Sequence, residues 1–229
     1  MYSGESKLIT PSRSRRMSLV ISHPQMPGGY NRRRNLRYLG GMVKAQRCSW
    51  CGDDPLYVEY HDHEWGVPEH DGGALFERLV LEGMQAGLSW YTILKKREHM
   101  REVFFGFQPA KLARYGPRRM DKWLQDPGII RHRGKLEAMV ENARCYLQHD
   151  DFAGFIWSFV DGRPVHNRWR RLDQIPASTP ASVAMAKSLK AQGFRFVGPT
   201  TCYAFMQSTG LVNDHLTNCP AHQRCKELG

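Results

Sequence analysis

Cysteine and histidine side chains gather at the two ends of one long stretch of this sequence, and this grouping constrains the fold more than any other feature. One group falls within 48–63 and the other within 215–225, with two further cysteines between them, Cys145 and Cys202. The two groups consist of Cys48, Cys51, His61, His63, His215, Cys219, His222 and Cys225. Zinc takes four such ligands in a tetrahedron. Two ligands from each group would form one site and bring the start of the domain to its end.

The spacing within the groups does not by itself choose the four ligands. Cys48 and Cys51 have the spacing of a zinc knuckle, and Cys219 with His222 offers a matching pair. Alternatively, His215 and Cys219 are four residues apart and would share one face of a helix. Cysteine and histidine also occur without a metal. The sequence therefore predicts a zinc site and leaves its four ligands open.

The positive charge is concentrated in the first 45 residues. The chain of 229 residues has a formal net charge of +11, which indicates an anionic partner. Nine of the 33 basic residues and one of the 22 acidic ones fall within 1–45, so this segment carries +8 and the remainder +3. If the remainder binds nucleic acid, it does so through a local patch.

Residues 1–45 are rich in Ser, Arg, Gly and Pro and show no sustained periodicity. This composition predicts a basic, disordered extension. Two alternatives stay open: translation that truly begins near Met42, and an organelle transit peptide. The folded domain is predicted over 46–229.

Composition and cysteine usage exclude several classes of protein. With 41% hydrophobic and 24% charged residues, the chain is typical of a globular protein with a buried core. No uncharged apolar run approaches the ~20 residues that span a bilayer. Six cysteines are too few for a disulfide scaffold, and no secretory segment precedes them. The sequence therefore predicts a cytoplasmic protein in a reducing compartment.

Apolar residues from position 48 onward follow helical spacing. Asp71 is a candidate cap for a helix through 75–83, and Ser89 for another through 90–94. Further helices are predicted over 109–115, 133–148, 151–160, 180–191 and 200–209. Strand-like alternation is confined to short pieces such as 56–60. These patterns predict an all-α fold in one compact unit.

Glu82 is the most unusual residue of the predicted helices because it follows an apolar run. A buried carboxylate is costly unless it is paired. The alternative is a solvated position at the helix edge.

Four aromatic residues, Tyr57, Tyr60, Trp65 and Trp90, offer flat faces that can sandwich a planar ligand. The alternative interpretation is that these four side chains simply pack in an aromatic core.

A basic segment lies just before the predicted helix at 133–148. It reads Gly128-Ile129-Ile130-Arg131-His132-Arg133-Gly134-Lys135. A glycine-bracketed hairpin that opens a helix offers backbone N–H groups and basic side chains to a phosphate. An ordinary basic loop is the alternative.

Together these segments resemble 3-methyladenine DNA glycosylase of type I, a helix-hairpin-helix family of DNA repair enzymes. The resemblance covers about 46–219 with the motifs in order. The matching text includes Glu64-Trp65-Gly66-Val67-Pro68, Leu81-Glu82-Gly83, Gln85-Ala86-Gly87-Leu88-Ser89-Trp90, the segment 128–135, and Gly210-Leu211-Val212-Asn213-Asp214-His215. The extension at 1–45 and the tail after Cys219 have no counterpart in the family pattern.

The resemblance implies a role for each candidate residue. Glu82 and Tyr60 would be the catalytic pair that hydrogen-bonds the damaged base, with Trp90 stacked on it and Trp65 and Tyr57 completing the wall. Leu88 would fill the gap left by the flipped nucleotide. The DNA-binding residues would be Leu88, Arg131, Arg133, Gly134 and Lys135. One structural Zn²⁺ per chain would be held by Cys48, His61, His215 and Cys219.

The resemblance further implies a monomeric, monofunctional N-glycosylase that releases N3-methyladenine from double-stranded DNA. Two other classes of protein compete with it. A zinc-stapled DNA-binding protein without chemistry would leave Glu82 unexplained, since a carboxylate repels phosphate. A zinc hydrolase needs an open metal position, which a fourth ligand at Cys219 would fill.

Overall fold

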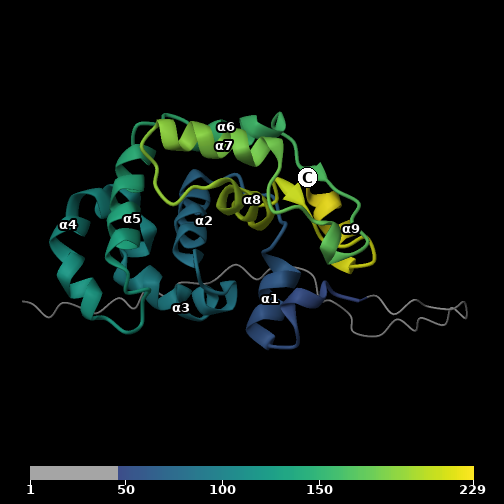
Figure 1. Cartoon of the computed structure of the whole chain (residues 1–229), viewed down its shortest axis with the longest axis horizontal. Helices are drawn as coiled ribbons and strands as arrows, with labels where there is room; N and C mark the ends of the chain where they lie inside the picture. The colour runs from purple at the N-terminus through teal and green to yellow at the C-terminus, as the bar shows by residue number, and fades with distance from the viewer. Residues whose placement is uncertain (1–45) are drawn as a thin grey trace, which may run out of the picture. The chain divides into compact units, whose positions relative to one another are not determined.

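The computed structural model describes residues 46–229. The predictions for 1–45, a disordered extension or its alternatives, lie outside the described residues. Within 46–229 the chain forms nine α-helices, four short 3₁₀ helices (η) and two short strands (Figure 1). In chain order these are η1 (Ser49–Cys51), α1 (Pro55–His63), α2 (Gly72–Gln85), α3 (Trp90–Val103), η2 (Phe105–Phe107), α4 (Pro109–Gln125), α5 (Arg133–Tyr146), α6 (Phe152–Trp157), η3 (Ser158–Val160), β1 (Val165–His166), η4 (Leu172–Gln174), α7 (Pro180–Ala191), α8 (Pro199–Ser208), β2 (Val212–Asn213) and α9 (Pro220–Leu228).

Helix α2 is the centre of the helical body. It contacts α3, α5, α6 and α8, while α4 packs on α5 and α7 on α8 (Figure 1). The apolar residues Leu75, Phe76 and Leu79 of α2 are fully buried in the main core. The two strands pair in parallel, with Val165 opposite Val212. This arrangement places the C-terminal halves of α2 and α8 next to α1, where the pocket described below opens.

Most helix starts fall where capping residues predict them. The Asp71 carboxylate accepts a hydrogen bond from the Ala74 amide at 2.8 Å, and the Ser89 hydroxyl accepts one from the Thr92 amide at 3.2 Å. Helix α7 has the predicted bounds, and α8 begins one residue earlier than predicted. The prediction of a mainly helical body is confirmed.

Residues 56–60 belong to α1, so the strand-like interpretation of this segment is wrong. The Asp54 carboxylate accepts hydrogen bonds from the amides of Leu56 at 3.0 Å and Tyr57 at 3.3 Å. Pro55 occupies the first helical position, where its missing N–H costs nothing. The capping pair therefore outweighs the short alternation of apolar residues.

Two other helical predictions need correction. Helix α4 continues from 115 to Gln125 through Gly116 and Pro117, and Gly116 lets α4 approach α5 closely. A Cβ at Gly116 would lie 2.5 Å from Val140. His215 and Cys219 do not share a helix, since they lie in the loop between β2 and α9. Among residues 46–229, no helix is long and apolar enough to cross a membrane.

Candidate functional site

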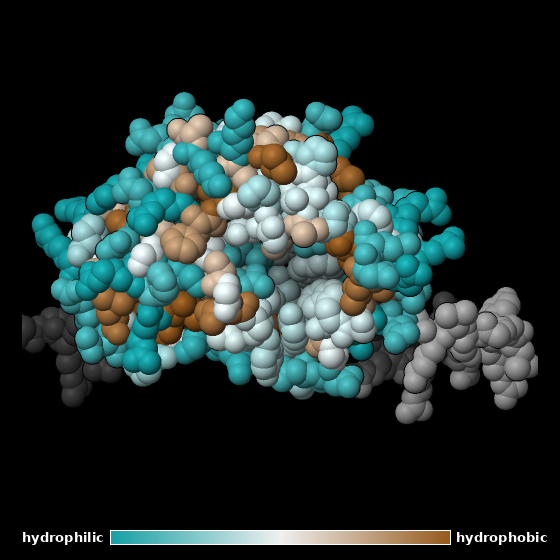
Figure 2. Space-filling view, in the orientation of Figure 1, coloured by the Kyte–Doolittle hydropathy of each residue, from teal (hydrophilic) through white to brown (hydrophobic). Residues whose placement is uncertain are grey.

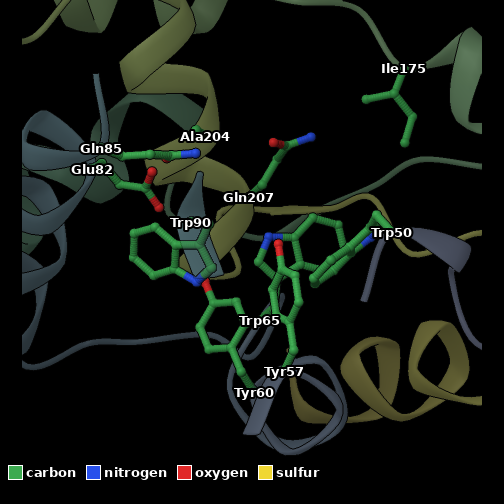
Figure 3. Close-up of a pocket in the computed structure, with 10 residues that line it drawn as sticks. All are labelled: Trp50, Tyr57, Tyr60, Trp65, Glu82, Gln85, Trp90, Ile175, Ala204 and Gln207. Atoms are coloured by element: carbon green, nitrogen blue, oxygen red, sulfur yellow. The ribbon is translucent and has the colours of Figure 1, made fainter. Parts of the chain in front are cut away.

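A cavity of about 250 Å³ opens between α1, α2 and α8. Figure 3 shows its lining, and Figure 2 shows a hollow in the same face of the molecule. Helix α1 supplies Tyr57 and Tyr60, α2 supplies Glu82, and Trp90 begins α3. The full lining is Trp50, Tyr57, Tyr60, Trp65, Glu82, Gln85, Trp90, Ile175, Ala204 and Gln207. The cavity can hold one planar, bicyclic ligand.

All four predicted aromatic residues line this cavity. The Tyr60 and Trp90 ring centroids are 5.3 Å apart, and both side chains are buried. Trp50, which sequence reasoning missed, packs edge-on against Trp65 at 4.9 Å and against Tyr57 at 5.2 Å. Its place between two cysteines was the only signal available. The aromatic residues therefore form the wall of an open pocket, which a simple aromatic core would not.

Glu82 is buried at the side of this cavity, so the solvated alternative is wrong. Its side chain points into the cavity (Figure 3), and Oε2 has no hydrogen-bond partner among the described residues. Burial raises the pKa of Glu82 to about 7, although a hydrogen bond from Ser208 and the charge of Arg78 act against this rise. The indole Nε1 of Trp90 is also buried without a partner among the described residues. A buried acceptor and a buried donor without partners indicate a polar ligand.

An ion-pair cluster of Glu64, Arg78 and Arg97 lies next to the pocket. Arg97 donates from both terminal nitrogens to Glu64, at 2.5 and 2.7 Å, and Arg78 donates to the same carboxylate at 3.2 Å. Burial alone would raise the pKa of Glu64, but the two arginines hold it below its usual range. The Arg78 guanidinium also lies 5.4 Å from the Tyr60 ring centroid and 5.9 Å from that of Trp90. The arginines therefore neutralise Glu64 and leave Glu82 as the pocket's unpaired carboxyl group.

A second cluster brings together four buried side chains from the two ends of the body. Cys48, His61, His215 and Cys219 offer ligand atoms that all lie within 4.8 Å of one another. The Cys48 and Cys219 sulfurs lie 3.7 and 3.8 Å from His215 Nδ1, and Cys219 Sγ lies 3.6 Å from His61 Nε2. Metal–ligand distances of about 2.3 Å for sulfur and 2.0–2.1 Å for nitrogen give separations of roughly 3.6 Å in a tetrahedron. The four residues therefore fit a tetrahedral metal ion.

The outer nitrogens of both histidines are held by hydrogen bonds. His61 Nδ1 lies 2.8 Å from Asp62 Oδ1, and His215 Nε2 lies 2.8 Å from the backbone oxygen of Trp65. Metal-bound histidines are commonly oriented in this way. Both contacts leave the inner nitrogen of the ring facing the two sulfurs.

The other cysteines and histidines of the two groups point elsewhere, which contradicts the knuckle spacing. The Cys51 thiol donates to the Cys48 backbone oxygen at 3.2 Å, and His222 Nε2 lies 2.8 Å from the Asn167 oxygen. His63 is exposed beside Glu59. The spacing of two residues is therefore misleading here, because the Cys51 thiol points to the Cys48 carbonyl and is not among the four converging ligand atoms.

The basic hairpin divides into exposed and buried parts. Arg131 is exposed, and Arg133 pairs with Asp121 at 2.8 Å on the surface. Lys135 is 7% exposed, and its ammonium donates to the backbone oxygens of Met84 at 2.9 Å and Ala86 at 2.6 Å. These carbonyls end α2 and lack helical partners. The structure thus gives Lys135 a role within the fold, against the prediction that its ammonium contacts DNA.

The two remaining residues of the predicted DNA-binding set are Leu88 and Gly134. Leu88 is 43% exposed in the turn between α2 and α3. Gly134 lies in the first turn of α5, where backbone N–H groups have no helical partner. His132 caps this helix by accepting from the Lys135 amide at 3.2 Å.

An aromatic pocket with an unpaired acid, set in a helical body, is the kind of site in which enzymes that act on nucleobases hold a base outside the stack. The model of the methyladenine glycosylase family matches residues 50–222. The DNA-3-methyladenine glycosylase 1 of Escherichia coli is 53% identical over 178 residues, which are 76% of this chain and 95% of the relative. The DNA-3-methyladenine glycosylase of Haemophilus influenzae is 52% identical, over 76% of this chain and 96% of the relative.

Solved structures agree with these relatives. A crystal structure of 3-methyladenine DNA glycosylase I has a TM-score of 0.75 and 55% identity, and the match covers 76% of this chain and 98% of that one. A Staphylococcus aureus 3-methyladenine DNA glycosylase I has a TM-score of 0.74 and 40% identity, with 76% and 95% covered. The chain belongs to the methyladenine glycosylase family and is therefore a hydrolase of N-glycosidic bonds.

Proposed function

We propose that the protein acts in base-excision repair as a monofunctional glycosylase that flips N3-methyladenine out of double-stranded DNA and hydrolyses its N-glycosidic bond. The observation that carries this proposal is the buried carboxyl group of Glu82, which has an unpartnered oxygen inside an aromatic pocket. Relatives that are more than half identical bear the name of this activity.

The pocket matches the electronic character of this base. N3-methylation leaves the adenine ring cationic while it is still bound to the sugar. An ionised Glu82 attracts this charge, and the faces of Trp90 and Tyr60 favour a cation above them. Glu82 and Tyr60 hydrogen-bond the base, Trp90 stacks on it, and Trp65 and Tyr57 close the wall. Ordinary purines carry no such charge and gain less from the pocket.

The reaction needs little help at the leaving group. The electron pair of the glycosidic bond moves onto the cationic base, which departs as neutral 3-methyladenine. Water adds to the sugar C1′ and releases its proton to solvent. Because the base already carries its positive charge, no acid has to protonate it. Recognition and extrusion are therefore the main tasks of the protein's own residues.

DNA contacts are assigned to the face that carries Leu88 and the hairpin. Leu88 fills the space of the extruded nucleotide. The first turn of α5 at Gly134 binds a phosphate through backbone N–H groups. Arg131 and Arg133 add positive charge beside it. Lys135 is left out of this assignment because it is buried.

The Cys/His cluster is assigned to one structural zinc ion. Four protein ligands leave no position for a reactive water, so zinc at this site supplies folding energy and no step of the reaction. His61 follows Tyr60 in α1, so the same site orients one wall of the pocket. We further assign the protein to the cytoplasm and to a monomeric state.

The proposed activity is tested by incubating the purified full-length protein with double-stranded DNA treated with a methylating agent. Free 3-methyladenine should appear in the supernatant and be absent with unmethylated DNA. A DNA-binding protein without chemistry would retard the same DNA in a gel and release no base, and that result would refute the proposal.

A further inference from the structure

Lys135 is a buried cation to which the function proposed above gives no role. It lies in the first turn of α5, which packs against α2 (Figure 1). Burial lowers the pKa of its ammonium, and among residues 46–229 no carboxylate pairs with it. Its described partners are the backbone oxygens of Met84 and Ala86. Because removing a cation from water is costly, such a contact indicates that the position of these two carbonyls matters.

The two carbonyls belong to the end of α2 and to a tight turn that leads to Leu88. The Leu88 amide donates to the Gln85 oxygen at 2.6 Å and closes this turn over 85–88. Ala86 has a φ of −44° and a ψ of 116°, and Gly87 has a φ of +77°. These angles are those of a type II turn, whose third residue needs a positive φ and is therefore commonly glycine.

The hydrogen bond from Lys135 fixes the type of this turn. Type I and type II turns differ chiefly in the orientation of their central peptide plane, so the carbonyl of the second residue points in opposite directions in the two types. That carbonyl is the one of Ala86, and the Lys135 ammonium donates to it at 2.6 Å. The same ammonium holds the Met84 carbonyl at 2.9 Å. Lys135 thus fixes the direction in which the chain leaves α2 and carries Leu88.

We propose that Lys135 is a positioning residue that keeps the 85–88 turn in register with the first turn of α5, so that Leu88 enters the duplex while α5 holds a phosphate. This inference rests on the function proposed above, which assigns Leu88 to the gap of the extruded nucleotide and Gly134 to the phosphate. Gly134 directly precedes Lys135. The same turn of α5 therefore reaches DNA through its N–H groups and α2 through the lysine, and both contacts are arranged before DNA binds.

This role concerns extrusion of the nucleotide and not recognition of the base. Without the ammonium, the peptide plane between Ala86 and Gly87 is free to rotate, and Leu88 no longer has one fixed direction. The side chains of Glu82 and Tyr60 are held in the core by their own burial. Binding of a free base, which needs no extrusion, should therefore not depend on Lys135.

The test is a double-mutant cycle between Lys135 and Leu88 in the full-length protein, measured as single-turnover release of 3-methyladenine from methylated double-stranded DNA. We expect Lys135→Met to slow release about tenfold in the wild-type background. In a chain that already carries Leu88→Ala, the same change should slow release by less than about twofold, because no wedge is left to position. The affinity for free 3-methyladenine, titrated by tryptophan fluorescence, should stay unchanged.

Ser182→Ala is the matched control for a general loss of stability. Ser182 is buried in the first turn of α7, where it exchanges hydrogen bonds with Thr179. Its loss should lower the melting temperature and leave the rate of base release within about twofold. Equal slowing by Lys135→Met with and without Leu88, or a loss of free-base binding, would overturn the inference, since either result marks a general disturbance of the fold.

A second variant tests the same peptide plane if Lys135→Met does not fold. Gly87→Ala meets no atom within 4 Å, but alanine disfavours the φ of +77° and so favours the other orientation of the plane. It should slow release in the wild-type background and not in the Leu88→Ala background, and slowing in both would refute the role of the turn. Failure of the wild-type protein to release 3-methyladenine would instead overturn the proposed function.

Discussion

Replacing Glu82 by glutamine removes a negative charge that faces the proposed base and changes the size of the side chain little. At an effective dielectric constant of about 20, a carboxylate attracts a cation ~5 Å away by roughly 3 kcal/mol. At pH 8, above the pKa of about 7 that burial gives Glu82, most of this attraction is present. We therefore expect Glu82→Gln to lower kcat/KM for N3-methyladenine in DNA by about 100-fold.

Binding of the free base separates recognition from activation of water. Free 3-methyladenine has lost the fixed charge, so its affinity should fall only through the mismatched hydrogen bond, by about 1–3 kcal/mol. The measurements are base release from methylated DNA and titration of tryptophan fluorescence with the free base. Unchanged affinity for the free base together with abolished release would refute the recognition role. That result would identify Glu82 as the group that activates water.

The same substitution should stabilise the fold, in contrast to its effect on activity. The pKa of Glu82 is raised in the folded state, from 4.5 to about 7, so the native state holds a proton that the unfolded state has released. Stability is therefore lost as pH rises from about 4.5 to about 7, by up to about 3 kcal/mol. Glu82→Gln should show no such loss. Denaturant unfolding at pH 5 and pH 8 measures this change in the free energy of unfolding. An equal pH dependence in the wild-type protein and the variant would contradict the conclusion that burial raises the pKa of Glu82.

Three further predictions concern the metal cluster, the N-terminal segment and the buried lysine. Cys219→Ala should abolish the zinc content measured by mass spectrometry and lower the melting temperature, whereas Cys51→Ala should keep the metal. A chain that begins at Met42 should retain its rate of base release and bind undamaged DNA with a weaker dependence on salt, which filter binding measures. Lys135→Met should cost about 1–3 kcal/mol in denaturant unfolding because the Met84 and Ala86 carbonyls lose their donor; an unchanged unfolding midpoint would exclude this role.

Sequence reasoning identified much of the pocket because buried polar and aromatic groups stand out locally. Glu82 is conspicuous in an apolar helix, and the predicted aromatic residues line one cavity with it. Ala204 and Gln207 also line the cavity but carried no local signal, because only the packing of α8 in the folded chain brings them there. Lys135 was misassigned for a related reason. A lysine in a basic segment predicts a solvated charge, and only the packing of α5 on α2 shows the carbonyls that it satisfies.

The Cys/His cluster joins residues that are far apart in the order of synthesis. Cys48 and His215 are 167 positions apart, so the first half of the cluster leaves the ribosome roughly 10–30 s before the second. During this interval α1 has its tyrosines but nothing from 215–219 to hold it. A chain interrupted before residue 215 would keep the contacts between α1 and α3 but would lack the cluster that ties α1 to the loop after β2. Synthesis of residues 215–219 therefore sets the earliest moment at which all four side chains of the cluster can meet.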